Sequence, residues 1–188
     1  MKMVKYCCIA VVLFACGIAS AQTKAEVPHA PSTIFDRAIT NLEHEFVPAA
    51  DAMPEDKYSF APSNGEFKGI RTFAQQVKHV AAVNYMLAGA ILEEKPPVDL
   101  GGENGPDSVK SKADIMKFLN DSFAYLHKAM GSLTDKNLTE GVKSPFGEGK
   151  ASRLGLASIA VAHPFDHYGQ MVEYLRMNGI VPPASRGQ

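Results

Sequence analysis

The sequence lacks sulfur ligands, tryptophan and any strong charge bias. Its three cysteines all lie within the first 16 residues, and it has no tryptophan. The rest of the chain therefore offers no disulfide and no thiolate, either as nucleophile or as metal ligand. With 19 basic and 20 acidic residues the net charge is −1, and no basic patch typical of a nucleic-acid-binding protein is present. A phosphate-binding glycine loop and a serine nucleophile elbow are also missing.

The first 21 residues have the pattern of a cleaved signal peptide. A short basic start (1–5) precedes an apolar run over 6–15, which is too short to span a bilayer as a mature helix. Small residues at 19–21 then form a cleavage site, which makes Gln22 the expected mature N-terminus. We therefore expect an exported protein, periplasmic or secreted, with no membrane span after leader cleavage. Loss of Lys2 and Lys5 with the leader, which has no acidic residue, takes the net charge from −1 to −3.

A lipoprotein is the alternative interpretation of the same segment. Cys16 follows the small residue Ala15, as in a lipid-attachment site, and would then anchor the protein. Phe14 fits such a signal poorly, and the cleavage site at 19–21 lies just beyond it. We favour export without lipidation.

After a polar, flexible lead-in over 22–31, the sequence predicts one all-α domain over 32–185. Apolar residues recur at helical spacing over 32–53, 71–94, 111–130 and 152–178. Ser32 is the expected cap of the first helix, and Pro48 is expected to bend or shorten its last turn. The connecting segments are rich in Gly, Pro, Asn, Asp and Ser, with one short extended piece at 142–146. Four amphipathic helices without a substantial sheet predict a four-helix bundle.

Three histidines form the candidate metal site. His163 and His167 are one helical turn apart, so their imidazoles project from one face, roughly 6 Å apart at Cβ. His79, in the second helical stretch, is the third expected ligand. A lone helical histidine is usually a packing residue, but a pair with a third on another inward face favours ligation. Three imidazoles and no fourth side chain leave an open coordination position, as in catalytic zinc sites.

Pro164 leaves two interpretations of the last helix open. The helix either continues with a kink, because proline removes a donor and crowds the carbonyl of Ala160, or begins at Pro164 with His163 near its cap. Both keep His163 and His167 within reach of one ion.

The positions of the three histidines resemble those of a known family. His79 in the second helix and the His163–His167 pair in the fourth, with the stretches 71–73, 166–170 and 176–183, resemble an exported subgroup of the DinB-like, or YfiT-like, proteins. The resemblance covers about residues 34–185. It implies a bundle with a long crossover connection, homodimer formation, and zinc or nickel held by the three histidines and water. It also implies hydrolysis or group transfer, thiol transfer included, on an unidentified small molecule.

Other polar residues have weaker assignments. Asn84, Gln170 and Tyr174 are candidate substrate-binding residues, with interhelical hydrogen bonding as the alternative. Three arginines could bind an anionic substrate, although helix-end pairing is the simpler interpretation; they are Arg71, Arg153 and Arg176. His44 and His127 have polar sequence neighbours and are expected on solvated faces. A non-catalytic metal-binding or small-ligand-binding bundle of the cell envelope remains the alternative to an enzyme.

Overall fold

The protein is a four-helix bundle, as the sequence predicts. The computed structural model describes residues 30–102 and 104–187, so the expected leader, its cleavage site and Cys16 lie outside the described residues. Four long helices dominate this part of the chain: α1 (Pro31–Ala52), α2 (Phe73–Leu92), α3 (Lys112–Gly131) and α4 (Arg153–Met177). Single 3-10 turns lie at Glu55–Lys57 and Pro183–Ser185.

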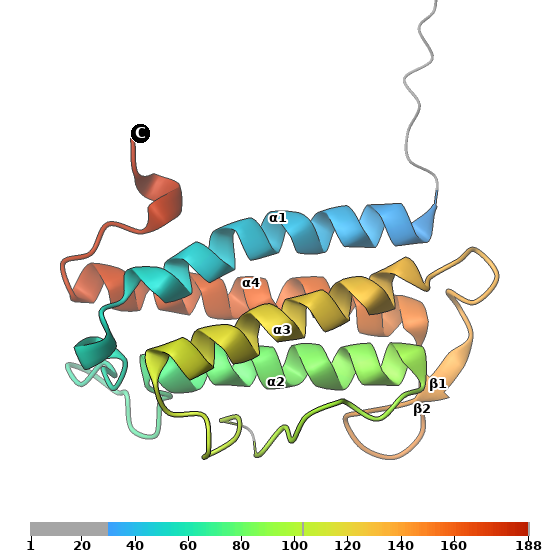
Figure 1. Cartoon of the computed structure of the whole chain (residues 1–188), viewed down its shortest axis with the longest axis horizontal. Coiled ribbons are helices and arrows are strands. Elements are labelled where there is room, and N and C mark those ends of the chain that lie inside the picture. Colours follow the sequence, from blue (N-terminus) through green and yellow to red (C-terminus); the bar gives the residue numbers. More distant parts are fainter. Residues whose placement is uncertain (1–29, 103, 188) are drawn as a thin grey trace, which may run out of the picture.

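The extended piece expected at 142–146 is extended only to Lys143, where it forms one strand of a short hairpin; residues 145–146 lie in a turn. Strand β1 (Gly141–Lys143) pairs antiparallel with β2 (Lys150–Ser152), and these are the only two strands in the described residues. The hairpin lies at the end of the bundle where α3 finishes and α4 begins (Figure 1).

A long crossover sets the topology. The segment from the end of α2 to the start of α3 returns along the length of the bundle, so α2 and α3 run in the same direction (Figure 1). Helices α1 and α4 run in the opposite direction, and α2 packs against both α3 and α4. Helices α2 and α4 are antiparallel and in contact, so side chains on their facing sides can interact along the length of the interface.

Side-chain caps explain why three of the helices begin where they do. Thr72 precedes α2 and forms a reciprocal capping box with Gln75: the Gln75 amide donates to Thr72 Oγ1 at 3.2 Å, and the Thr72 amide donates to Gln75 Oε1 at 2.8 Å. Ser111 and Ser152 cap α3 and α4 without a reciprocal bond: their hydroxyl oxygens accept from the backbone amides of Asp114 and Gly155.

The expected start of the first helix is wrong by two residues. Its cap position is Ala30, not Ser32, and Pro31 is the first helical residue. Proline suits that position because its fixed φ is already helical and the amide it lacks would have had no partner. The helix also continues through Pro48 to Ala52 instead of ending early.

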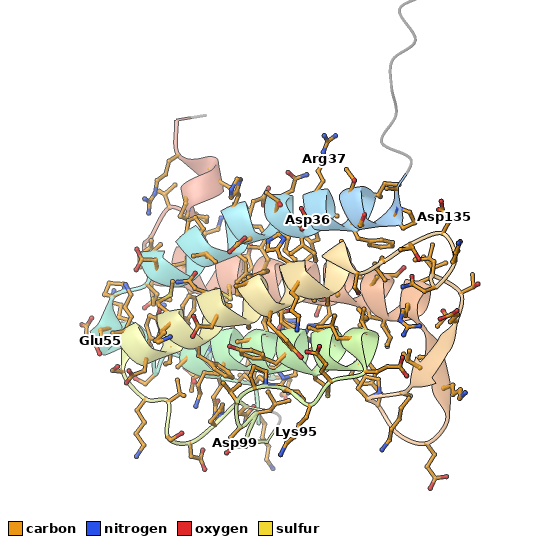
Figure 2. All side chains as sticks on the ribbon, turned by 45° about the vertical axis from the view of Figure 1, so that its right-hand side comes forward. Asp36, Arg37, Glu55, Lys95, Asp99 and Asp135 are labelled. Atoms are coloured by element: carbon orange, nitrogen blue, oxygen red, sulfur yellow. The ribbon has the colours of Figure 1, made fainter. Side chains whose placement is uncertain are left out.

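The core lies between the four helices, and α2 is its most buried member. The core-facing apolar residues of α2 are buried along the whole helix, from Phe73 through Val80 to Ile91. Charged side chains cover the outside, as at Arg37, Glu55 and Asp135 (Figure 2). None of the described helices is both long and apolar enough to cross a membrane.

Candidate metal centre

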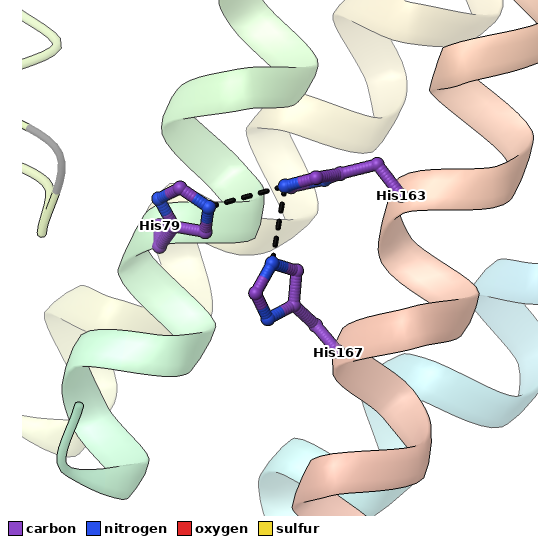
Figure 3. Close-up of side chains that lie close together, drawn as sticks. All are labelled: His79, His163 and His167. Carbon is purple, nitrogen blue, oxygen red and sulfur yellow. Dashed lines mark hydrogen bonds between the residues drawn. The ribbon is translucent and has the colours of Figure 1, made fainter. Parts of the chain in front are cut away.

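The three predicted histidines converge between α2 and α4. His79 projects from α2, and His163 and His167 project from successive turns of α4 (Figure 3). His163 Nε2 lies 3.1 Å from His79 Nε2 and 3.1 Å from His167 Nε2. One ring nitrogen from each residue lies within 4.8 Å of the other two. The triad is therefore a compact group that could hold a single ion.

The contacts at His163 Nε2 fit shared metal ligation better than hydrogen bonding. A neutral ring nitrogen carries either one proton or one lone pair, so it cannot form two full hydrogen bonds at once. A tetrahedral ion about 2.0–2.1 Å from each nitrogen places pairs of ligand nitrogens roughly 3.3 Å apart. The two separations of 3.1 Å are close to that value.

The electrostatics keep the α4 pair neutral. Burial, the neighbouring His167 and His79, and then Arg71 lower the pKa of His163 from 6.5 to about 3. Burial and the charges of His79 and Arg71 lower the pKa of His167 to about 4, although Asp166 opposes the shift. Both imidazoles are therefore neutral near pH 7, the form that can donate a lone pair to a metal.

Helix α4 is continuous through Pro164. It runs without a break from Arg153 to Met177, so the interpretation in which a helix begins at Pro164 is wrong. His163 and His167 thus share one helical face, as the four-residue spacing predicts. Pro164 is buried, and because it has no amide proton, the carbonyl of Ala160 loses its usual helical donor there.

The second nitrogens of the α4 pair have no partners in the described part of the chain. Nδ1 of His163 and Nδ1 of His167 are both buried without a hydrogen bond. A metal-bound histidine normally carries a proton on its second ring nitrogen and donates it to a carboxylate or a carbonyl. Asp166 does not serve that purpose, since neither Nδ1 has a partner in this part of the chain; its Oδ2 accepts a hydrogen bond of 2.9 Å from Gln170 Nε2.

A chain of side-chain amides borders the triad. Gln170 Oε1 accepts a hydrogen bond of 2.7 Å from Gln76 Nε2, while the Gln170 amide nitrogen donates to Asp166. The carboxylate can only accept, so it fixes the orientation of both amides. Gln76 Oε1 is left buried without a partner among the described residues. Sequence reasoning missed Gln76, although its position three residues before His79 places it on the same helical face.

The other candidate substrate-binding residues make hydrogen bonds between structural elements. Asn84 is fully buried, and its Nδ2 donates to Ser122 Oγ on α3 at 3.3 Å. Tyr174 donates its hydroxyl proton to the carbonyl of Arg71 at 3.0 Å. Gln170 also lines a surface pocket, whereas neither Asn84 nor Tyr174 lines a pocket beside the triad.

A cavity of about 450 Å³ opens beside the triad. His79 and His163 line it together with Arg71, two glycines of the crossover and a set of apolar side chains. We call it the apolar pocket; its apolar members are Ala82, Val83, Met86, Leu100 and Phe146. A small molecule in this pocket would lie against two of the three candidate ligands.

Comparison with known proteins identifies the family. The model of the DinB superfamily matches residues 38–171, well over half of the chain. The chain belongs to the DinB superfamily. The matched region of this DinB chain includes all three histidines and most of the bundle.

Solved structures agree with that assignment at the level of the fold. A DinB-like protein from Bacillus cereus superposes with a TM-score of 0.60 and 18% identity, over 79% of this chain and 93% of its own. A DinB-like protein from Bacillus subtilis gives a TM-score of 0.59 and 18% identity, over 82% and 99% of the two chains. None of the curated proteins matches the sequence significantly.

Proposed function

We propose that this DinB protein binds one divalent ion, zinc or nickel, through His79, His163 and His167. The observation that carries the proposal is the meeting of three ring nitrogens from two helices, with His163 Nε2 3.1 Å from each of the other two. Imidazole suits both metals, and the mature chain has no cysteine to compete as a ligand.

We further propose that the ion makes the protein a hydrolase or a group transferase, thiol transfer included, acting on a small molecule. Once bound, such an ion supplies Lewis acidity toward an oxygen or sulfur atom of the substrate. The apolar pocket supports this proposal because it borders His79 and His163, where an incoming molecule can reach the site. The protein's own contribution is to hold the imidazoles neutral and to exclude water with the pocket's apolar walls.

The proposal is tested first by metal content. The purified protein, treated mildly with a chelator and reloaded with zinc or nickel, should retain about one ion per chain. Alanine at any one of His79, His163 or His167 should weaken metal binding by roughly 100-fold or more, since even the outer-shell partners of a ligand contribute 10–100-fold. His44→Ala is the matched control, because His44 is exposed on α1.

Catalysis needs a separate assay. Zinc- and nickel-loaded protein should be tested on ester, amide and thiol-transfer substrates beside the loaded His44→Ala control and the His167→Ala variant. Turnover that disappears only in His167→Ala supports an enzyme. Metal binding without turnover on any of these classes would favour the alternative, a metal-binding or ligand-binding bundle of the cell envelope.

A further inference from the structure

Three buried polar atoms between α2 and α4 have no hydrogen-bond partner among the described residues. They are Nδ1 of His163, Nδ1 of His167 and Oε1 of Gln76. Buried polar groups in folded proteins are almost always hydrogen-bonded, so an unpaired one points to a contact that the working protein makes. A fourth such atom, Oδ1 of Asn84, belongs to a side chain that contacts α3, where its amide donates to Ser122 Oγ.

The register of α2 against α4 places Gln76 closer to His167 than to His163. Gln76 Nε2 donates to Gln170 Oε1 at 2.7 Å, so these two residues face each other across the interface. Gln170 follows His167 by three residues, about 4.5 Å along the helix axis, but follows His163 by seven, about 10 Å. The rings of His79 and His167 also face each other, with centroids 4.8 Å apart. The two glutamines therefore form the next level of the interface beside that pair.

The orientation of the His167 ring agrees with this register. In Figure 3 the dashed line joins Nε2 of His167 to His163, and the other ring nitrogen, Nδ1, lies on the far side of the ring. That side faces the direction in which α4 continues toward its C-terminus, where Gln170 follows one turn later. Nδ1 of His167 is therefore directed toward the level that the two glutamines occupy.

A chain of hydrogen bonds decides which end of the Gln76 amide remains available. Asp166 Oδ2 can only accept, and it takes a hydrogen bond of 2.9 Å from Gln170 Nε2. Gln170 therefore presents its Oε1 to Gln76, which donates through Nε2 and keeps Oε1 as an acceptor. Gln76 is only 1% exposed, so bulk water does not compete for that oxygen. A neutral imidazole that keeps its lone pair on Nε2 carries its proton on Nδ1, which makes His167 a matching donor.

We propose that Gln76 is a positioning residue of the metal site: its Oε1 accepts the Nδ1 proton of His167, directly or across one ordered water molecule. This hydrogen bond selects the tautomer whose Nε2 can ligate and holds the ring in place. Through Gln170, the exposed carboxylate of Asp166 then supports an imidazole that it does not touch. The inference rests on the proposed function and deepens it, because it names the residue that tunes the affinity of the same site for its ion.

The first test compares Gln76→Leu with Gln170→Leu as its matched control. Both changes remove the same interhelical hydrogen bond, but only Gln76→Leu removes the acceptor for His167. Gln76→Leu should weaken zinc binding roughly 10–100-fold, as loss of an outer-shell partner does, whereas Gln170→Leu should weaken it less than tenfold. Competition with a chelator at one fixed pH measures both. Equal losses in the two variants, or no loss in Gln76→Leu, would overturn the inference.

The second test identifies the tautomer of His167 by nuclear magnetic resonance of the metal-free protein with ¹⁵N-labelled histidine. The signal that disappears in His167→Ala belongs to His167. In the wild type it should show the proton on Nδ1, and it should move in Gln76→Leu but stay near its wild-type position in Gln170→Leu. A Gln76 side chain that served only packing would select neither tautomer. A proton on Nε2 of His167 in the wild type overturns the inference, even where a variant fails to fold.

Metal content separates this inference from the proposed function. A wild type that retains no zinc, but whose His167 proton is on Nδ1 and responds to Gln76→Leu, contradicts the proposed function and supports the contact with Gln76. A wild type that retains zinc, but binds it no more tightly than Gln76→Leu does, supports the metal site and contradicts the role of Gln76.

Discussion

At the residue scale, the neutral state of His163 and His167 sets how acid the solution must become before protons displace a metal. Their lowered pKa values, about 3 and about 4, mean that the charged forms are disfavoured in the folded protein. The lone pairs therefore stay available well below the ordinary histidine pKa of 6.5. The same shifts make the metal-free fold less stable in acid, because the unfolded chain takes up these protons at a higher pH than the folded one does.

This gives a prediction for metal affinity against pH. Corrected for buffer competition, zinc affinity should fall by less than roughly tenfold for each pH unit between pH 6.5 and 5, and should collapse only near pH 4. Titration with a competing chelator at each pH measures it. The release of two or more protons per bound ion between pH 6.5 and 5 would show that the α4 pair titrates normally and would contradict the burial argument.

Sequence spacing was sufficient to predict the triad but not its surroundings. His163 and His167 could be paired because four residues make one helical turn, and His79 because it falls on an inward face of another helix. The Gln76–Gln170–Asp166 chain could not be foreseen in the same way. Its contacts depend on the relative register of α2 and α4, which no local pattern in either helix encodes.

At the element scale, His127 joins α3 to α1. Its Nδ1 lies 2.6 Å from Asp36 Oδ1, and its Nε2 lies 3.1 Å from Glu43 Oε2, both on α1. The expectation of a solvated face is met only in part for His127: its side chain is 27% exposed, but the facing helix supplies two carboxylates. Asp36 is labelled in Figure 2 on α1. Burial opposes a charge on the ring, but the hydrogen bonds and charges of Asp36 and Glu43 outweigh it and raise the pKa of His127.

The raised pKa predicts a contribution to stability that depends on pH. A group whose pKa is raised by folding stabilises the fold below its unfolded pKa of 6.5, and the stabilisation is lost as pH rises through the folded pKa. His127→Gln should therefore cost more stability at pH 5.5 than at pH 9. The difference should be about 0.5–1 kcal/mol, because the three side chains are partly exposed. Urea unfolding at the two pH values measures it, and His44→Gln should show no such difference.

The helices themselves were largely predictable, and the misplaced boundary has a physical cause. Ser111 and Ser152 each precede an apolar run, where a serine hydroxyl can accept from one of the first free amides of a helix, and both do so. The first helix begins at Pro31 and is not capped by Ser32, since proline at the first helical position needs no cap hydrogen bond. The parallel arrangement of α2 and α3 follows from a crossover long enough to return along the bundle (Figure 1).

At the scale of the whole molecule, the predicted export implies a processed chain without cysteine. We expect intact mass and N-terminal sequencing of protein recovered from the cell envelope or medium to give a mature chain that starts at Gln22. Removal of residues 1–21 takes all three cysteines with it, so the folding of the mature chain should be indifferent to reductant. A lipid on Cys16, or an uncut leader on the folded protein, would contradict this prediction.

Metal binding should stabilise the whole bundle, because the triad joins two helices that are far apart in the sequence. A ligand that binds only the folded state stabilises it by about 2.7 kcal/mol when its free concentration is roughly 100 times its dissociation constant. The unfolded chain separates His79 from the α4 pair by more than 80 residues, so it offers no comparable three-nitrogen site. For a domain of this size the melting temperature should then rise by roughly 5–10 °C.

Differential scanning calorimetry with and without zinc measures this rise. The wild type and His44→Ala should both show it, since His44 is exposed and distant in sequence from all three candidate ligands. His167→Ala should melt at the same temperature with or without zinc, because two remaining imidazoles bind too weakly to shift the equilibrium at that concentration. A histidine cluster that served only packing would behave differently. Zinc would not raise the melting temperature of the wild type, and His167→Ala would still melt at a lower temperature than the wild type because a buried side chain had been removed.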